Sequence, residues 1–148
     1  MLCLAFFMRG GNNLKNSVVA GFIAGIISGI VASILHLSGL WELLSVLPYD
    51  PTPVSPQTTV LIEITWWILW GLIWGAFYSL FYDYIPSKGI KKGLFYGLIL
   101  WIMVFSRNSF VYASYGYYLS AFLFALMGFV SVSIAYGITI GYLYKPKK

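Results

Sequence analysis

The stretch VVAGFIAGIISGIVASIL, residues 18–35, decides the fold, because it is continuously apolar and holds no charged side chain. No Asp, Glu, Lys or Arg occurs from Asn16 to Trp41. A bilayer core of about 30 Å needs about 20 helical residues at about 1.5 Å each, so this run can form one membrane-spanning helix. It lacks the alternation of polar and apolar residues that marks a barrel strand, and a helix is therefore favoured.

The rest of the chain has the same apolar character. Of its 148 residues, 60% are hydrophobic, 20% are aromatic and 9% are charged, and the mean hydropathy is +0.84. A soluble domain carries roughly 25% charged residues, because water must solvate its surface. The composition excludes a water-soluble enzyme, a disordered tail and a nucleic-acid-binding domain, and it predicts a chain that uses lipid as its solvent.

Three further charge-free runs predict three further helices. The runs extend from Ile64 to Tyr82, from Gly93 to Ser106 and from Asn108 to Tyr144. The last is too long for one span, so its start, which is rich in tyrosine and serine, is assigned to a connection. We therefore expect an all-α integral membrane protein, a single domain over residues 1–148, with four transmembrane helices near residues 16–40, 59–84, 90–111 and 117–143.

The basic residues predict the orientation of these helices. Eight of the nine fall on one side, and they are Arg9, Lys15, Lys88, Lys91, Lys92, Lys145, Lys147 and Lys148. The other side has Arg107, together with Glu42, Asp50 and Glu63. Short loops rich in Lys and Arg stay in the cytoplasm, so we expect a multi-pass cell-membrane protein with both termini cytoplasmic. An inner face this basic is also expected to bind anionic lipid.

Small residues recur every four positions in all four helices. The glycines in these rows are Gly21, Gly25, Gly29, Gly71, Gly75, Gly93, Gly97, Gly137 and Gly141. Residues at i and i+4 share a helix face, so the rows predict close helix packing. The second and fourth helices share a longer pattern, Gly71-x-x-x-Gly75-x-x-Tyr78 and Gly137-x-x-x-Gly141-x-x-Tyr144. It favours two parallel helical-hairpin repeats, and chance is the alternative because Gly and Tyr are abundant here.

Three ionisable residues on three different helices form a candidate polar layer near the outer face. Counting about 1.5 Å per residue from the inner basic residues brings Glu63, Arg107 and His36 to similar depths. Charges at membrane depth usually have partners, so we expect Glu63 to pair with Arg107. The pair is either a structural salt bridge or part of a gate or binding site that opens outward. His36 is interpreted as a hydrogen-bonded packing group or a sensor of external pH.

Deep tryptophans of the second helix form a candidate aromatic pocket, which consists of Trp67, Trp70 and Trp74. Trp70 and Trp74 are expected to lie below the interfacial belt that tryptophans usually occupy. An indole N–H in hydrocarbon needs an acceptor. The three side chains either line a pocket for a quinone, a lipid tail or a partner helix, or they pack against lipid.

Few features of the chain point to catalysis. Cys3 is the single cysteine, which excludes an intrachain disulfide and a cysteine-based metal or iron–sulfur site. The sequence has no phosphate-binding glycine loop, no haem histidine pair and no His/Glu metal spacing. We therefore expect no enzyme activity, no cofactor and no metal. The apolar start, residues 1–8, precedes its basic residue, so an interfacial anchor is favoured over a cleaved signal peptide.

Two functions fit these features. The first is a non-catalytic accessory or assembly subunit of a membrane complex, favoured by small size, glycine-faced helices and deep tryptophans. The second is a small transporter or channel that acts as a parallel homo-oligomer, favoured by the repeat and by the layer of Glu63, Arg107 and His36. The expected partners are the lipid bilayer and either other membrane subunits or further copies of this chain, with no nucleic acid.

Overall fold

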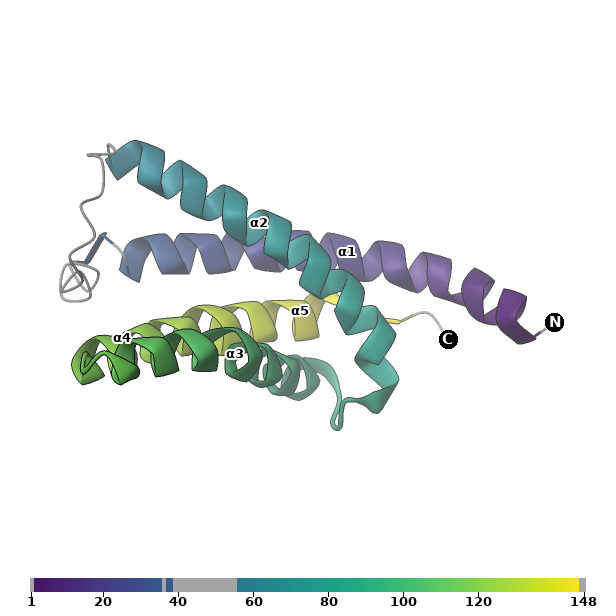
Figure 1. Ribbon diagram of the computed structural model, residues 1–148. Coiled ribbons are helices and arrows are strands. Elements are labelled where there is room, and N and C mark those ends of the chain that lie inside the picture. Colours follow the sequence, from purple (N-terminus) through teal and green to yellow (C-terminus); the bar gives the residue numbers. More distant parts are fainter. Residues whose placement is uncertain (1, 36, 39–55, 147–148) are drawn as a thin grey trace.

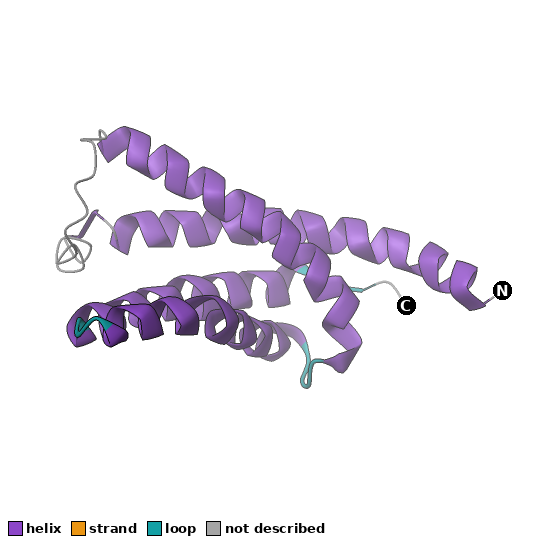
Figure 2. Cartoon of the chain, viewed as in Figure 1, coloured by secondary structure: helices purple, strands orange, loops and turns teal. Residues whose placement is uncertain are grey.

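The computed structural model describes the backbone of residues 2–35, 37–38 and 56–146, and their side chains except at 2–12, 56, 59 and 106–108 (Figure 1). The described residues are mostly helical. Helix α1 is Leu2–Leu35, α2 is Pro56–Phe81 and α3 is Gly89–Ser114. The 3-10 turn η2, Tyr82–Tyr84, continues α2. The last long helix consists of α4 (Tyr118–Gly128), the π-helix η3 (Phe129–Tyr136) and α5 (Gly137–Leu143). Figure 2 shows no strand in these described residues.

Four helical stretches of the described chain are long and apolar enough to cross a membrane, which confirms that part of the prediction. They are Asn13–Leu35, Val60–Tyr84, Gly89–Ser114 and Tyr118–Leu143. The predicted bounds of the second, third and fourth helices agree with the structure to within about three residues. The third helix continues to Ser114, so the connection to α4 is a short turn of residues 115–117, with Gly116 at φ +82°.

The first predicted transmembrane helix starts near residue 16, within three residues of the membrane-spanning stretch Asn13–Leu35, but the helix itself extends further towards the N-terminus. Helix α1 begins at Leu2 and is 34 residues long, while the predicted end near residue 40 lies outside the described residues. Arg9 and Lys15 indicate where a helix leaves the lipid, but a solvated charge does not end a helix. No proline occurs before Pro48, so the backbone hydrogen bonds of α1 can continue past both basic residues.

The four long helices run alternately up and down as two hairpins. Figure 1 shows that α1 and α2 form one hairpin, that α3 and the α4–α5 helix form the other, and that both termini lie at the same end of the bundle. We call that end, with η2 and the start of α3, the terminal end, and the opposite end, with the start of α2 and the α3–α4 turn, the far end. Helix α1 packs on η3 and α5 as well as on α2, so it joins the two hairpins.

Backbone-to-backbone contact joins α1 to α2. A Cβ atom added at Gly21 would lie 2.6 Å from the Cα of Gly75, and one added at Gly71 would lie 2.7 Å from the Cα of Gly25. Real Cβ atoms essentially never approach that closely. The contact is looser at Gly29, where an added Cβ would be 3.2 Å from the Cα of Ile64. The glycine rows therefore lie at the crossing of the two helices, as close packing in lipid requires.

The second hairpin is built in the same way. A Cβ atom added at Gly93 would lie 2.6 Å from the Cα of Gly141, and one at Gly97 would lie 2.9 Å from the Cα of Ser133. Gly137 faces the backbone of Leu94. Each hairpin thus places the glycines of its two helices against one another.

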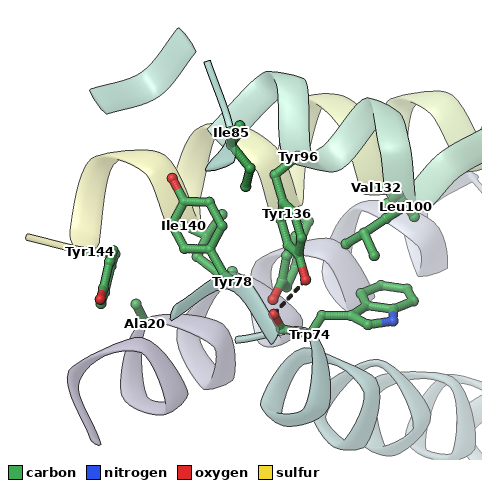
Figure 3. Packing of buried hydrophobic residues seen from close by; sticks show 11 residues of the cluster. Ala20, Trp74, Tyr78, Ile85, Tyr96, Leu100, Val132, Tyr136, Ile140 and Tyr144 are labelled. Atoms are coloured by element: carbon green, nitrogen blue, oxygen red, sulfur yellow. Dashed lines mark hydrogen bonds between the residues drawn. The ribbon is translucent and has the colours of Figure 1, made fainter. Parts of the chain in front are cut away.

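Aromatic side chains fill the space where the hairpins meet. The buried cluster contains Trp74, Tyr78, Tyr96, Tyr136 and Tyr144, with smaller side chains around them (Figure 3). Helix α1 contributes alanines at this place, Ala20 and Ala24, which are 3% and 0% exposed. Because these side chains are small, the rings of the other helices can pack directly against the α1 backbone.

Candidate functional site

A group of tyrosines lies between three helices in the terminal half of the bundle. This tyrosine cluster consists of Tyr78 and Tyr82 from α2 and η2, Tyr96 from α3, and Tyr136 and Tyr144 from the last helix. The centroid of the Tyr78 ring is 4.9 Å from that of Tyr96 and 5.4 Å from that of Tyr144. Tyr82 is 5.0 Å from Tyr144 by the same measure. The cluster therefore holds the two hairpins together at one level.

Two hydroxyls of the cluster donate to backbone carbonyls of α2. Tyr96 Oη donates to the carbonyl oxygen of Trp74 at 2.7 Å, and Tyr136 Oη donates to that of Gly71 at 3.2 Å (Figure 3 shows the Tyr96 bond). Each carbonyl already belongs to a helical turn, so the tyrosine uses its second lone pair. These bonds tie α3 and η3 to the middle of α2.

The hydroxyl of Tyr78 differs from these two. Its oxygen is buried and has no hydrogen-bond partner among the described residues, and Tyr78 itself is 0% exposed. A buried polar atom without a partner costs about 1–3 kcal/mol. Tyr78 therefore contributes its ring to the packing, while its hydroxyl contributes no hydrogen bond.

Replacing these tyrosines with phenylalanine should separate the two cases. Tyr96→Phe should lower the free energy of unfolding by about 1 kcal/mol, because the bond to Trp74 is lost and the ring remains. Tyr78→Phe should leave stability unchanged or raise it, because it removes an unpaired buried hydroxyl. Equilibrium unfolding of both variants by SDS in mixed micelles measures the difference. A larger loss for Tyr78→Phe than for Tyr96→Phe would show that the Tyr78 hydroxyl has a partner.

A buried lysine closes the terminal end of the cluster. Lys92 of α3 is 7% exposed, and its Nζ donates to the carbonyl oxygen of Tyr82 at 2.5 Å while lying 3.8 Å from the centroid of the Tyr82 ring. A cation at the carbonyl end of a helix and over an aromatic face is favourable on both counts. Burial, with smaller contributions from Tyr82 and Asp83, raises the pKa of Tyr144 to about 12.

A groove of about 660 Å³ lies between α2 and α3, next to the tyrosine cluster. We call it the α2–α3 groove. Its walls are almost entirely apolar or aromatic, and they consist of Trp70, Ile73, Trp74, Phe77, Phe81, Tyr84, Ile85, Pro86, Phe95, Tyr96, Ile99, Leu100, Met103 and Val104. A volume of about 300–1,000 Å³ is typical of ligand pockets. The groove is therefore a candidate binding site for an apolar ligand.

The candidate aromatic pocket of the sequence coincides with this groove in part. Trp70 and Trp74 belong to its α2 wall, with ring centroids 5.5 Å apart. Trp67 does not line the groove, and it packs edge-on against Trp74 with a centroid distance of 6.0 Å. The α3 wall was not foreseen, although Phe95, Ile99 and Met103 are spaced four residues apart, which is the signal of a shared helix face.

The candidate polar layer is described only in part. Glu63 of α2 is half-buried and accepts a hydrogen bond from Oγ of Ser33 of α1 at 3.3 Å, so one of its contacts links α1 to α2. His36 and the side chain of Arg107 lie outside the described residues. In Figure 1, the start of α2 and the end of α3 lie on opposite sides of the far-end part of α1. The pairing of Glu63 with Arg107 stays a prediction.

Neither a metal centre among the described side chains nor a relative indicates a function for this chain. Among the side chains that the structure describes, no group of three or more His, Cys, Asp or Glu could hold a metal ion. The chain matches no family model, no curated protein and no solved structure. The described residues form two kinds of surface that can bind apolar groups. These are the α2–α3 groove and the exposed faces of the helices.

Proposed function

We propose that this chain is a non-catalytic accessory or assembly subunit of a membrane complex, and that it binds a transmembrane helix of its partner along α2. One observation carries the proposal. In the most apolar windows of α2 and α3, 17% and 20% of the residues are buried inside the fold, against 44% in α1 and 39% in the last helix. Helix α2, the least buried of the four, therefore has a face that the described residues do not cover.

That face is an apolar strip in the far half of α2. Ile62, Trp66 and Leu69 are 61%, 59% and 51% exposed. Their spacing of four and then three residues is the spacing at which one helix packs along another. The nearby hydroxyl of Thr65 donates to the carbonyl oxygen of Leu61 at 2.8 Å, so it does not interrupt the strip with an unpaired polar group. We call these three side chains the α2 strip.

The internal packing supports this choice of face. In lipid, helices associate through close packing and hydrogen bonds, because the hydrophobic effect does not drive them together. The small residues of α2, Gly71 and Gly75, are already used against α1. A partner must therefore pack against the large side chains of the strip, and Trp66 offers the largest contact area among them.

The proposal includes a topology in the cell membrane. Exposed lysines, Lys15, Lys88, Lys91 and Lys145, lie on or next to the terminal-end segments, which favours a cytoplasmic location for that end and for both termini. The matching glycine contacts in the two hairpins support a parallel repeat, with an axis along the membrane normal. A partner helix on the α2 strip would then contact the half of α2 near the outer leaflet.

Photo-crosslinking in native membranes tests the proposed docking face. A photoreactive phenylalanine analogue at Trp66 should give an adduct with one partner polypeptide, identified by mass spectrometry. The same analogue at Phe122 of α4, which is 64% exposed, is the matched control and should give none. Adducts of equal yield at both positions, or no polypeptide adduct at Trp66, would overturn the proposal.

A parallel homo-oligomer that acts as a small transporter or channel is the second candidate. It is favoured by Glu63, since an acid in a membrane helix, hydrogen-bonded across α1 and α2, is typical of ion or substrate pathways. The crosslinking distinguishes the two candidates, because an adduct between copies of this chain at Trp66 would favour the homo-oligomer. Native mass spectrometry of the purified chain would then give the number of copies.

A further inference from the structure

We propose that the α2–α3 groove binds an acyl chain of an anionic phospholipid, with the lipid phosphate held by Lys88 and Lys91. This site is separate from the α2 strip, so either proposal can fail without the other. It rests on three properties of the groove, which are its length, its lining and the charges at its mouth.

The length of the groove fits a lipid chain better than a helix. Its α2 wall runs from Trp70 to Tyr84, which is about 21 Å of helix at about 1.5 Å per residue. A bilayer core is about 30 Å thick, and one leaflet is about half of that. The groove thus accommodates a chain from one leaflet and ends before the far leaflet is crossed. A partner's transmembrane helix would need a surface that continues to the far end.

The lining of the groove suits hydrocarbon. Its side chains are aliphatic or aromatic, and the hydroxyl of Tyr96 is already bonded to the carbonyl oxygen of Trp74. Tyr84, at the terminal end, is 84% exposed and stands where a headgroup would lie. Tyrosines at this level are usual, because the ring lies in the apolar region and the hydroxyl reaches the polar one.

The charges at the mouth fit an anionic headgroup. Lys91 is four residues before Phe95, so it lies on the same face of α3 as Phe95, Ile99 and Met103, one turn nearer the terminal end. Lys88 follows the groove residue Pro86 by two positions, and both lysines are exposed. Lysines just beyond the end of a membrane helix attract anionic lipid.

The neighbouring lysine is engaged elsewhere, which leaves Lys88 and Lys91 to face the lipid. Lys92 is buried, and its Nζ donates to the carbonyl oxygen of Tyr82. That bond ties η2 to the first turn of α3, close to the mouth of the groove. Asp83 is the acidic residue near the mouth, and the two free lysines outweigh its charge.

Lipid competition on the purified full chain tests the site. Native mass spectrometry from detergent should show several-fold tighter retention of phosphatidylglycerol than of phosphatidylcholine by the unmodified chain. The double variant Lys88→Gln with Lys91→Gln should lose about tenfold in phosphatidylglycerol affinity and keep its weak phosphatidylcholine binding. Lys145→Gln is the control, because Lys145 is an exposed lysine at the same end that follows α5, a helix with no side chain in the groove, and it should retain the preference.

A second measurement identifies the occupant of the groove. A photoreactive phenylalanine analogue at Ile99, inside the groove, should give an adduct with the mass of a lipid. A polypeptide adduct there, an equal loss of preference in Lys145→Gln and in the double variant, or no loss in the double variant would each overturn the proposal. Thermal unfolding of each variant in the same detergent shows that it is folded, since the substituted lysines are exposed and contribute little to packing.

Discussion

Replacing Gly71 with alanine is expected to lower the free energy of unfolding by about 3 kcal/mol. The added Cβ would lie 2.5 Å from the carbonyl oxygen of Gly21 and 2.7 Å from the Cα of Gly25. Both are backbone atoms, so relief requires α1 and α2 to move apart, and overpacking of this kind costs about 1–3 kcal/mol or more. The movement would also strain the Tyr136 bond to the Gly71 carbonyl. These losses exceed the gain of about 1 kcal/mol that alanine brings to a helix.

Gly29→Ala is the control for this effect, because it makes the same chemical change in the same hairpin. There the nearest atoms to an added Cβ are at 3.2 Å, and one of them, the Cβ of Trp67, belongs to a side chain. We expect a change within about 1 kcal/mol, since the helical gain and the tighter contact nearly cancel. SDS unfolding in mixed micelles measures both variants. Equal losses at the two positions would show that the backbone contact is not the cause.

Replacing Trp74 with alanine is expected to cost about 3–5 kcal/mol, the range found for large buried aromatic residues. Trp74 is 5% exposed, and its ring centroid lies 5.4 Å from that of Tyr136 and 5.5 Å from that of Trp70. Its removal would open a cavity between α2 and η3 and extend the groove into the core. In lipid, most of this cost comes from the van der Waals contacts that the ring loses. The transfer of an apolar side chain out of the protein interior contributes less there, because the surrounding hydrocarbon is apolar as well.

Trp66→Ala, eight residues earlier in the same helix, is the matched control. Trp66 is 59% exposed, and its ring centroid lies 5.8 Å from that of Trp70. Its loss should cost less than about 1 kcal/mol in the isolated chain. The same unfolding assay compares the two variants, and a cost at Trp66 that matches the cost at Trp74 would contradict the packing described for α2.

The sequence predicted the helices well because charge and apolar length are local properties. The charge-free runs gave three of the four helices to within about three residues, while α1 extends to Leu2 because its basic residues do not stop a helix. The spacing of Gly71, Gly75 and Tyr78, repeated at Gly137, Gly141 and Tyr144, pointed to similar helices. It did not predict that Tyr78 and Tyr144 touch, because that depends on how the hairpins dock.

Counting residues along a helix gives the depth of a side chain and not its position around the bundle, so the sequence could not specify the neighbours of the candidate site residues. The bond from Ser33 of α1 to Glu63 is one such neighbour, while the expected layer of Glu63, Arg107 and His36 stays a prediction. The groove has an α2 wall that the tryptophans indicated and an α3 wall that they did not. Its existence depends on α2 and α3 diverging, which no local pattern in either helix specifies.

The π-helix η3 sets the rotation of the last helix between two of its glycines, Gly128 and Gly137. Gly128 faces the ring of Phe105 and Gly137 faces the backbone of Gly93, so both point to α3. In a continuous α-helix, at about 100° per residue, nine residues would place them on opposite faces. The wider turns of Phe129–Tyr136 correct the rotational phase. An insertion or deletion in this segment would turn Gly137 and Gly141 away from α3, so its length is constrained even where its side chains are free to vary.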